Sequence, residues 1–212
     1  MPIDSNSAEK KLLIWFIVIL IFGSFLLVLQ SSKTNDTFMI HAIHKEAFAC
    51  IEHWEGQFES VGDALGTDCV IKGWYQDEHR LFLRPYKNNG FENEDWFGFN
   101  KEVLAPCDCT VEKIHINSKT NQPGIMNPSQ ASSITFKTTD DSYVVLAHVR
   151  EILVQEGQRI KRGQVVAKVG NNGYSRNPHI HVGAWDKEFK PLQIRFDQTT
   201  IGLLTKEEMK KK

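Results

Sequence analysis

The architecture is most clearly indicated by residues 170–185, GNNGYSRNPHIHVGAW. Turn-forming residues and Pro178 precede an alternating segment, which favours an extended entry into a β-strand over a helix. Within that strand His179 and His181 are two positions apart, so their imidazoles point to the same side, roughly 7 Å apart along the chain. This spacing suits neighbouring roles in a metal site, with one ring binding the ion and the other facing its water.

The residues before this segment follow a β pattern from Cys69 onward. Short runs rich in valine, isoleucine and aromatic residues alternate with turn residues such as Asn88-Asn89-Gly90. No amphipathic helix interrupts this half, so we expect a mainly β fold, a compact antiparallel sandwich or barrel. The expected strands are residues 69–75, 80–85, 110–117, 132–138, 142–149, 164–170 and 179–185.

The N-terminal region has a different pattern. Residues 12–29 are apolar or small throughout, and as a helix they rise about 27 Å, close to the roughly 30 Å of a hydrocarbon core. Lys10 and Lys11 precede this run, so the positive-inside rule predicts a single-pass anchor with the C-terminal domain exported. A cleaved signal peptide is the alternative, but the run ends without a small-x-small cleavage site.

A juxtamembrane amphipathic helix is expected between the anchor and the β region, because apolar residues recur every three or four positions from Phe38 to Phe58. His41 and His44 fall on this helix, where we interpret them as a polar stripe and not as a chelating pair. The chain is thus expected to divide into a cytoplasmic tail, a transmembrane helix, a linker with an amphipathic helix, a β domain and a charged C-terminal tail, at residues 1–11, 12–29, 30–66, 67–200 and 201–212.

Charge and cysteine content narrow the class of protein. The net charge is −1, with 25 Lys and Arg against 26 Asp and Glu, so no nucleic-acid partner is indicated. The four cysteines fall on the exported side, where disulfides form, but their spacing leaves three full pairings open. Cys107-x-Cys109 has the spacing of half a zinc site, yet no second pair accompanies it, so disulfides or buried thiols are favoured. The cysteines are Cys50, Cys69, Cys107 and Cys109.

Three further segments accompany the histidine pair along the chain. Alternation in residues 143–148, YVVLAH, places His148 on one face of a strand with Val144 and Leu146. Residues 157–170 predict a tight turn that leads into a strand. Upstream, Asp95 lies among aromatic residues before an Ala-Pro strand start, so its carboxylate is either capped by backbone donors or bound to a cation.

Taken in order, these segments resemble the lysostaphin-type, or LytM-like, zinc metallopeptidases, over roughly residues 88–185. The resemblance implies a compact antiparallel β domain that binds one zinc ion per chain and cuts peptides in bacterial peptidoglycan. It also implies that the anchor lies in the bacterial inner or cytoplasmic membrane. Carried over by motif, Asp95 and His181 are the implied metal ligands, and His148 and His179 the implied catalytic residues that flank the water on the zinc.

The sequence departs from the family pattern at one ligand. The family has a histidine four residues before the aspartate, and this chain has Phe91 there, which cannot bind zinc. His79, Glu92 or Glu94 would have to replace it. Two functions therefore stay open: a zinc endopeptidase acting on peptidoglycan, or a degenerate LytM-like domain that binds peptidoglycan or regulates a partner hydrolase.

Overall fold

The computed structural model describes Trp15 and residues 36–201. The chain divides into two compact units, residues 1–35 and 36–212, and the fold described below is that of the second. Apart from Trp15, the predicted cytoplasmic tail and transmembrane helix lie outside the described residues, as does the predicted C-terminal tail after Ile201. In the part of the chain that is described, no helix is long and apolar enough to cross a membrane.

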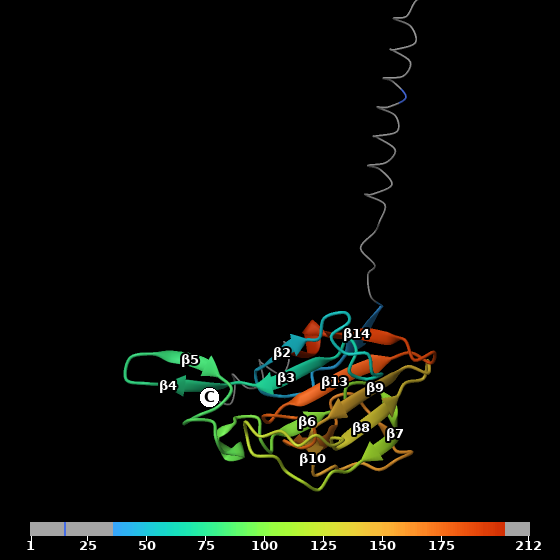
Figure 1. Cartoon of the computed structure of the whole chain (residues 1–212). Coiled ribbons are helices and arrows are strands. Elements are labelled where there is room, and N and C mark those ends of the chain that lie inside the picture. Colours follow the sequence, from blue (N-terminus) through green and yellow to red (C-terminus); the bar gives the residue numbers. More distant parts are fainter. Residues whose placement is uncertain (1–14, 16–35, 202–212) are drawn as a thin grey trace, which may run out of the picture. The chain divides into compact units, whose positions relative to one another are not determined.

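The described part of the second unit consists mainly of short strands, with one 3-10 helix and helical residues at positions 198–201, so the predicted mainly β fold is confirmed (Figure 1). In chain order the elements are β1 (Thr37–Ile40), β2 (Phe48–Glu52), β3 (Thr67–Ile71), β4 (Gly73–Gln76), β5 (Leu81–Arg84), η1 (Asn93–Asp95), β6 (Glu102–Leu104), β7 (Cys109–His115), β8 (Ser133–Lys137), β9 (Tyr143–Ala147), β10 (Val149–Arg150), β11 (Arg159–Ile160), β12 (Val165–Val169), β13 (Ile180–Trp185) and β14 (Pro191–Phe196).

The main sheet has nine strands, in the order β1-β14-β13-β9-β8-β7-β11, with β3 joined to β13 and β2 joined to β3. Strand β13 is its centre, because β9 pairs along one edge while β3 and β14 share the other edge. Only β1 and β14 run parallel; the other pairs of this sheet are antiparallel. This topology places the His179–His181 segment in the middle of the molecule's largest sheet.

A smaller sheet, β10-β12-β6, contributes to the same apolar core, and β4 and β5 form a separate hairpin that projects from the body of the fold (Figure 1). Alternation along β8 and β9 directs one face of the main sheet into that core. Burial of each large side chain there contributes about 1.5–3 kcal/mol. The largest fully buried apolar side chains include Ile40, Ile43, Val103, Leu104, Val111, Ile134, Phe136, Val144, Leu146, Val149 and Ile180.

The amphipathic helix predicted for residues 38–58 is wrong. That segment contains β1 and β2, which pair with the distant strand β14 and with β3. Ile43 is buried, but Ile51 and Trp54 are 73% and 70% exposed, so the three- and four-residue spacing does not mark one buried face. Because β1 and β2 belong to the main sheet, the β domain begins near Asp36 and not at the predicted residue 67.

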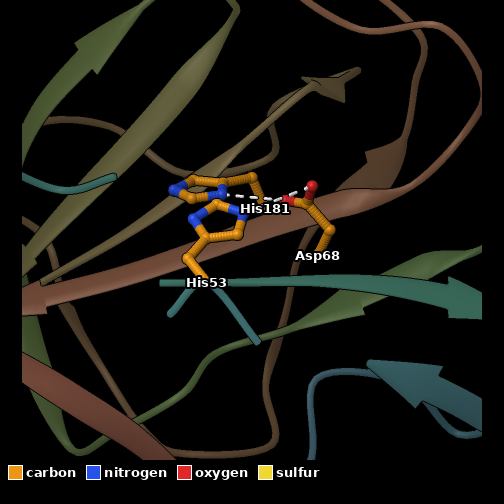
Figure 2. A group of neighbouring side chains, drawn as sticks. All are labelled: His53, Asp68 and His181. Atoms are coloured by element: carbon orange, nitrogen blue, oxygen red, sulfur yellow. Dashed lines mark hydrogen bonds and ion pairs between the residues drawn. The ribbon is translucent and has the colours of Figure 1, made fainter. Parts of the chain in front are cut away.

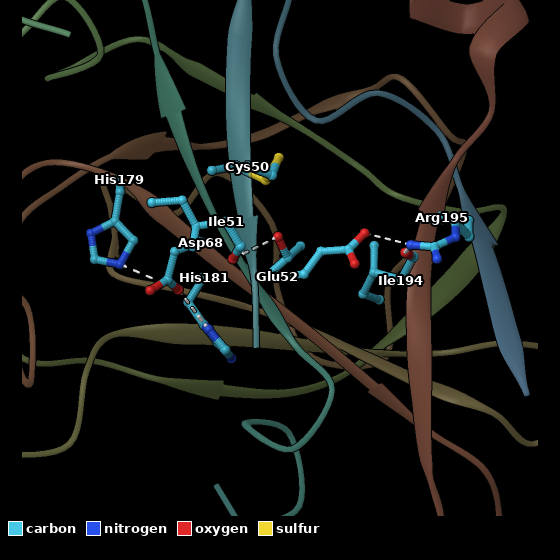
Figure 3. The surroundings of a disulfide bond; sticks show 10 residues. Cys50, Ile51, Glu52, Asp68, His179, His181, Ile194 and Arg195 are labelled. Atoms are coloured by element: carbon cyan, nitrogen blue, oxygen red, sulfur yellow. Dashed lines mark hydrogen bonds and ion pairs between the residues drawn. A yellow bond between two sulfur atoms is a disulfide. The ribbon is translucent and has the colours of Figure 1, made fainter. Parts of the chain in front are cut away.

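All four cysteines are paired in disulfides, which excludes the zinc half-site at Cys107-x-Cys109. Cys50 and Cys69 lie directly opposite each other and join β2 to β3. Cys107 and Cys109 close a turn at the start of β7. The first disulfide lies beside the histidine strand, as Figure 3 shows.

Candidate metal centre

His181 lies where three strands of the main sheet run side by side. It is directly opposite Asp68 of β3 on one side and Ala147 of β9 on the other. Ala147 is in turn opposite Ser133 of β8. Directly opposed residues project from the same face of an antiparallel sheet, so these four side chains form one row on the face away from the apolar core. The small Ala147 and Ser133 leave open space beside the polar pair.

His53 brings a third polar group to this row (Figure 2). It follows β2 directly, and the pairing of β2 with β3 carries its ring to Asp68. Nε2 of His53 lies 3.5 Å from Oδ2 of Asp68, and Nδ1 of His181 lies 2.9 Å from Oδ1 of Asp68. The rings of His53 and His181 stack with centroids 5.3 Å apart. One potential ligand atom from each of the three residues lies within 4.8 Å of the other two.

This set of donors fits a divalent metal ion. Two imidazoles and one carboxylate are a ligand set of catalytic zinc sites, which keep a fourth position open. The imidazole side chains of His53 and His181 are only 8% and 7% exposed, whereas Asp68 is 38% exposed. Within residues 36–201 this is the only group of three or more metal-binding side chains with such close ligand atoms.

The metal group opens into a groove of about 700 Å³. Its floor is formed by β8 and β9, and its walls come from the segments that precede β3, β8 and β13. The lining residues are His53, Phe58, Val61, Gly62, Asp63, Asp68, Met126, Ser129, Gln130, Ala131, Ser133, Val145, Ala147, His148, Tyr174, Ser175, Arg176, Asn177, His179 and His181.

His148 enters the groove from a bend between β9 and β10. Its φ angle is +63°, in the left-handed region that few residues other than glycine adopt. Nδ1 of His148 donates to the carbonyl oxygen of Asn172 at 2.8 Å. The Asn172 side chain is itself held, since it donates to Val149 O at 2.9 Å and accepts from Ser132 N at 2.7 Å. The ring of His148 is therefore fixed, with Nε2 left to accept a hydrogen bond.

His179 lies beside His148, with ring centroids 4.5 Å apart. Its Nδ1 donates to Asn177 O at 2.8 Å and lies 3.3 Å from Oγ of Ser175. Its Nε2 lies 3.6 Å from Oδ1 of Asp68. The structure thus brings together His148, His179 and His181, three of the four site residues expected from the sequence.

Burial and neighbouring charges shift the pKa values of this group in opposite directions. Burial alone raises the pKa of Asp68, but hydrogen bonds and charges of His179 and His181 outweigh it and hold the pKa below its ordinary value. Burial lowers the pKa of His181, while Asp68 and the Gly62 carbonyl raise it more, for a net increase. Burial, followed by the charge of His179, lowers the pKa of His148 to about 3. At neutral pH Asp68 is thus ionised and His148 neutral.

The Cys50–Cys69 disulfide joins the strands next to two of the candidate ligands, Asp68 and His53 (Figure 3). Cys69 is next to Asp68 on β3, and β2 leads from Cys50 to His53. The disulfide therefore restrains the position of His53 relative to Asp68.

Asp95, the aspartate predicted to bind metal with His181, does not reach this group. It ends η1, where its Oδ1 accepts from Nδ2 of Asn88 at 2.7 Å and its Oδ2 accepts from the backbone N of Glu92 at 3.5 Å. These donors satisfy a carboxylate that is only 7% exposed. The predicted ligand pair is therefore corrected: the aspartate beside His181 is Asp68.

Phe91 does not mark a lost ligand, because it lies outside the groove and is 67% exposed. None of the three predicted replacements joins the metal group: the ring of His79 is 86% exposed in the β4–β5 hairpin, Glu92 caps η1, and Glu94 lies within η1. The third candidate ligand is His53. The sequence signal that was available is an aspartate within the buried strand TDCVI, where an unpaired carboxylate is costly.

Comparison with known proteins finds a family model that matches part of the chain. Residues 95–193 match the model of Peptidase family M23. This range includes His148, His179 and His181, whereas His53 and Asp68 precede it. An uncharacterized metalloprotease of Haemophilus influenzae is 28% identical over 127 residues, 59% of this chain and 24% of that protein. The chain thus spans about a quarter of the length of this curated relative.

Two solved structures are among those to which the chain is similar. The catalytic domain of a point mutant of the prophage-encoded M23 protein EnpA from Enterococcus faecalis is 16% identical, covers 68% of this chain and 87% of that chain, and has a TM-score of 0.44. A putative peptidase M23 from Pseudomonas aeruginosa is 15% identical, covers 80% of this chain and 53% of that chain, and has a TM-score of 0.45.

Proposed function

This chain carries a domain of peptidase family M23, and on that premise we propose that it is a zinc endopeptidase that hydrolyses peptide bonds in bacterial peptidoglycan. The observation that carries the proposal is the group His53, Asp68 and His181, whose ligand atoms lie within 4.8 Å of one another. The apolar run at residues 12–29 supports a further part of the proposal, that the domain is exported and anchored in the inner or cytoplasmic membrane.

The side chains of the groove have separable tasks. His53, Asp68 and His181 would hold the ion, which as a Lewis acid polarises a peptide carbonyl and makes water a stronger nucleophile near neutral pH. The Nε2 atom of His148 is free to accept a hydrogen bond from water in the groove and so to orient it, because its Nδ1 proton is committed to Asn172 O. His179 lies beside His148 and, with its own Nδ1 committed to Asn177 O, would orient the peptide carbonyl or the water through Nε2.

The alternative function, a degenerate domain that binds peptidoglycan or regulates a partner hydrolase, rested on the absence of a third ligand. His53 supplies a candidate for that ligand, since its Nε2 lies 3.5 Å from the Asp68 carboxylate. We therefore favour the hydrolase over a purely binding role.

The test measures zinc and hydrolysis separately on the full-length chain in detergent. We expect about one zinc per chain after purification without added metal, as catalytic sites with three protein ligands hold their ion. His181→Ala should lose both the zinc and the release of new amino groups from purified peptidoglycan. His148→Ala and His179→Ala should keep the zinc and lose the hydrolysis.

His79→Ala is the matched control, because its ring is 86% exposed and lies outside the groove. It should change neither quantity. A folded wild-type chain that stays metal-free and ignores added zinc would refute the zinc-dependent hydrolase and return the binding role to first place.

A further inference from the structure

The groove contains one basic side chain that the proposed reaction does not use. Among its lining residues, Arg176 is the only lysine or arginine, whereas Asp63 and Asp68 are acidic. Asp63 lies beside the metal group, with its Oδ1 3.4 Å from Nε2 of His181. Arg176 belongs to the different segment that precedes β13. Asp63 and Arg176 therefore lie on different walls of the groove and carry opposite charges.

The guanidinium group of Arg176 has no partner within the described residues. None of the ion pairs or side-chain hydrogen bonds of residues 36–201 involves it, and the residue is exposed. Most other arginines of this unit are engaged: Arg80 pairs with Asp77, Arg195 with Glu52, and Arg84 stacks on Tyr75. Arg176 is thus free to bind a group that enters the groove.

Hydrogen bonds fix the backbone at Arg176 and at the residue before it. Its carbonyl oxygen accepts from Gly124 N at 2.8 Å. The preceding residue, Ser175, is buried: its carbonyl accepts from Nδ2 of Asn121 at 2.7 Å and its Oγ donates to Oδ1 of Asn171 at 2.9 Å. A fixed backbone with a free guanidinium loses little conformational freedom beyond that of the side chain when it binds a ligand.

We infer that Arg176 binds a carboxylate of the substrate peptide and so makes the protein specific for acidic peptides; the inference rests on the proposed function. A guanidinium presents paired N–H donors that match the two oxygens of a carboxylate. Outside the metal group, Arg176 is the only lysine or arginine that lines the groove, so it is the side chain there that a substrate carboxylate can pair with. The carboxylate is either an acidic side chain or the free C-terminus of the peptide.

The test uses muropeptides released from peptidoglycan, compared before and after carbodiimide coupling to ammonia has converted their carboxylates to neutral amides. Binding is measured on the full-length chain, and kcat/KM is measured where turnover occurs. Arg176→Gln should weaken binding of the untreated muropeptides about tenfold to a hundredfold, the worth of a charge-assisted hydrogen bond. The loss should appear in KM, and amidated muropeptides should bind the variant and the wild type equally.

Arg159→Gln is the matched control. Arg159 is exposed, has no ion pair among the described residues, and lies on β11 outside the groove, so its substitution changes net charge equally. It should leave binding of both muropeptide forms unchanged. Peptides amidated only at the C-terminus, or only on an acidic side chain, then show which carboxylate Arg176 binds.

The outcomes separate this inference from the proposed function. Binding that depends on Arg176 and on the carboxylates, without hydrolysis, would support the inference and refute the peptidase. Hydrolysis by an Arg176→Gln variant that is as efficient as the wild type, or an equal loss on both muropeptide forms, would overturn the inference. Muropeptides that do not bind the wild type at all would overturn it as well.

Discussion

The identity of the third metal ligand leads to opposite predictions for two substitutions. If His53 completes the metal group, His53→Ala should weaken zinc binding strongly. Phe91→His should then leave zinc affinity unchanged, because Phe91 is exposed and lies outside the groove. If Asp95 were the ligand instead, Phe91→His would raise the affinity and His53→Ala would have no effect.

The size of the expected loss follows from the number of ligands. Structural zinc sites with four protein ligands bind with about 10–16 kcal/mol, or about 3 kcal/mol for each ligand. Removing His53 from a group of three therefore weakens zinc affinity about a hundredfold or more, at 1.4 kcal/mol for each factor of ten.

Zinc affinity would be measured by competition with a chromophoric chelator at fixed pH, on the full-length chain. Asp95→Asn serves as a second control, since the Asp95 carboxylate is occupied by donors from Asn88 and Glu92. Its zinc affinity should equal that of the wild type even if η1 is destabilised. An unchanged affinity in His53→Ala, or a clear gain in Phe91→His, would refute the assignment of the metal group.

Two predictions concern stability. Burial lowers the pKa of His44 from 6.5 to about 4, so the unfolded chain takes up a proton between these values while the folded chain does not. The contribution of His44 to the free energy of unfolding should thus be fully present above about pH 6.5 and fall by about 3 kcal/mol as the pH drops to about 4. His44→Leu should flatten this dependence in urea titrations with a chelator present; an identical pH profile in wild type and variant would contradict it. Replacing Cys50 and Cys69 by alanine opens a loop with a sequence separation of 19 and should cost about 3 kcal/mol. It should also weaken zinc binding, because the disulfide restrains His53 relative to Asp68. The same change at Cys107 and Cys109, which are two positions apart, should have a smaller effect on both, and equal effects of the two pairs would count against this explanation.

The local sequence pattern was sufficient to predict a strand where that strand has one face in the core and one face outside it. Strands β8 and β9 both show this alternation in burial, and the sequence of β8, SITFK, also shows it in hydropathy. The same reasoning failed at residues 38–58, where apolar residues three and four apart indicated a helix. There β1 and β2 obtain their hydrogen bonds from β14 and β3, and this long-range pairing overrides the local period.

The candidate site was predicted in part for a similar reason. Alternation indicated that His179 and His181 point to the same side. It placed His148 with Val144 and Leu146, which face the core, and His148 reaches the groove only because the chain bends after β9, with a φ angle of +63° at His148. Asp95 was assigned by its position in a motif, but the structure satisfies its carboxylate within η1. Asp68 lies on β3, whose partner β13 is distant in sequence, and His53 follows β2, which pairs with β3. No local spacing links either residue to His181.

By itself, the sequence determined the β class of the domain, the strand that carries His179 and His181, and the resemblance to zinc peptidases, because these depend on side-chain alternation and short-range spacing. Only the tertiary structure decided which carboxylate and which further histidine face His181. That choice depends on the register between β3 and β13 and between β2 and β3, where a shift of one residue would turn Asp68 to the other face of the sheet.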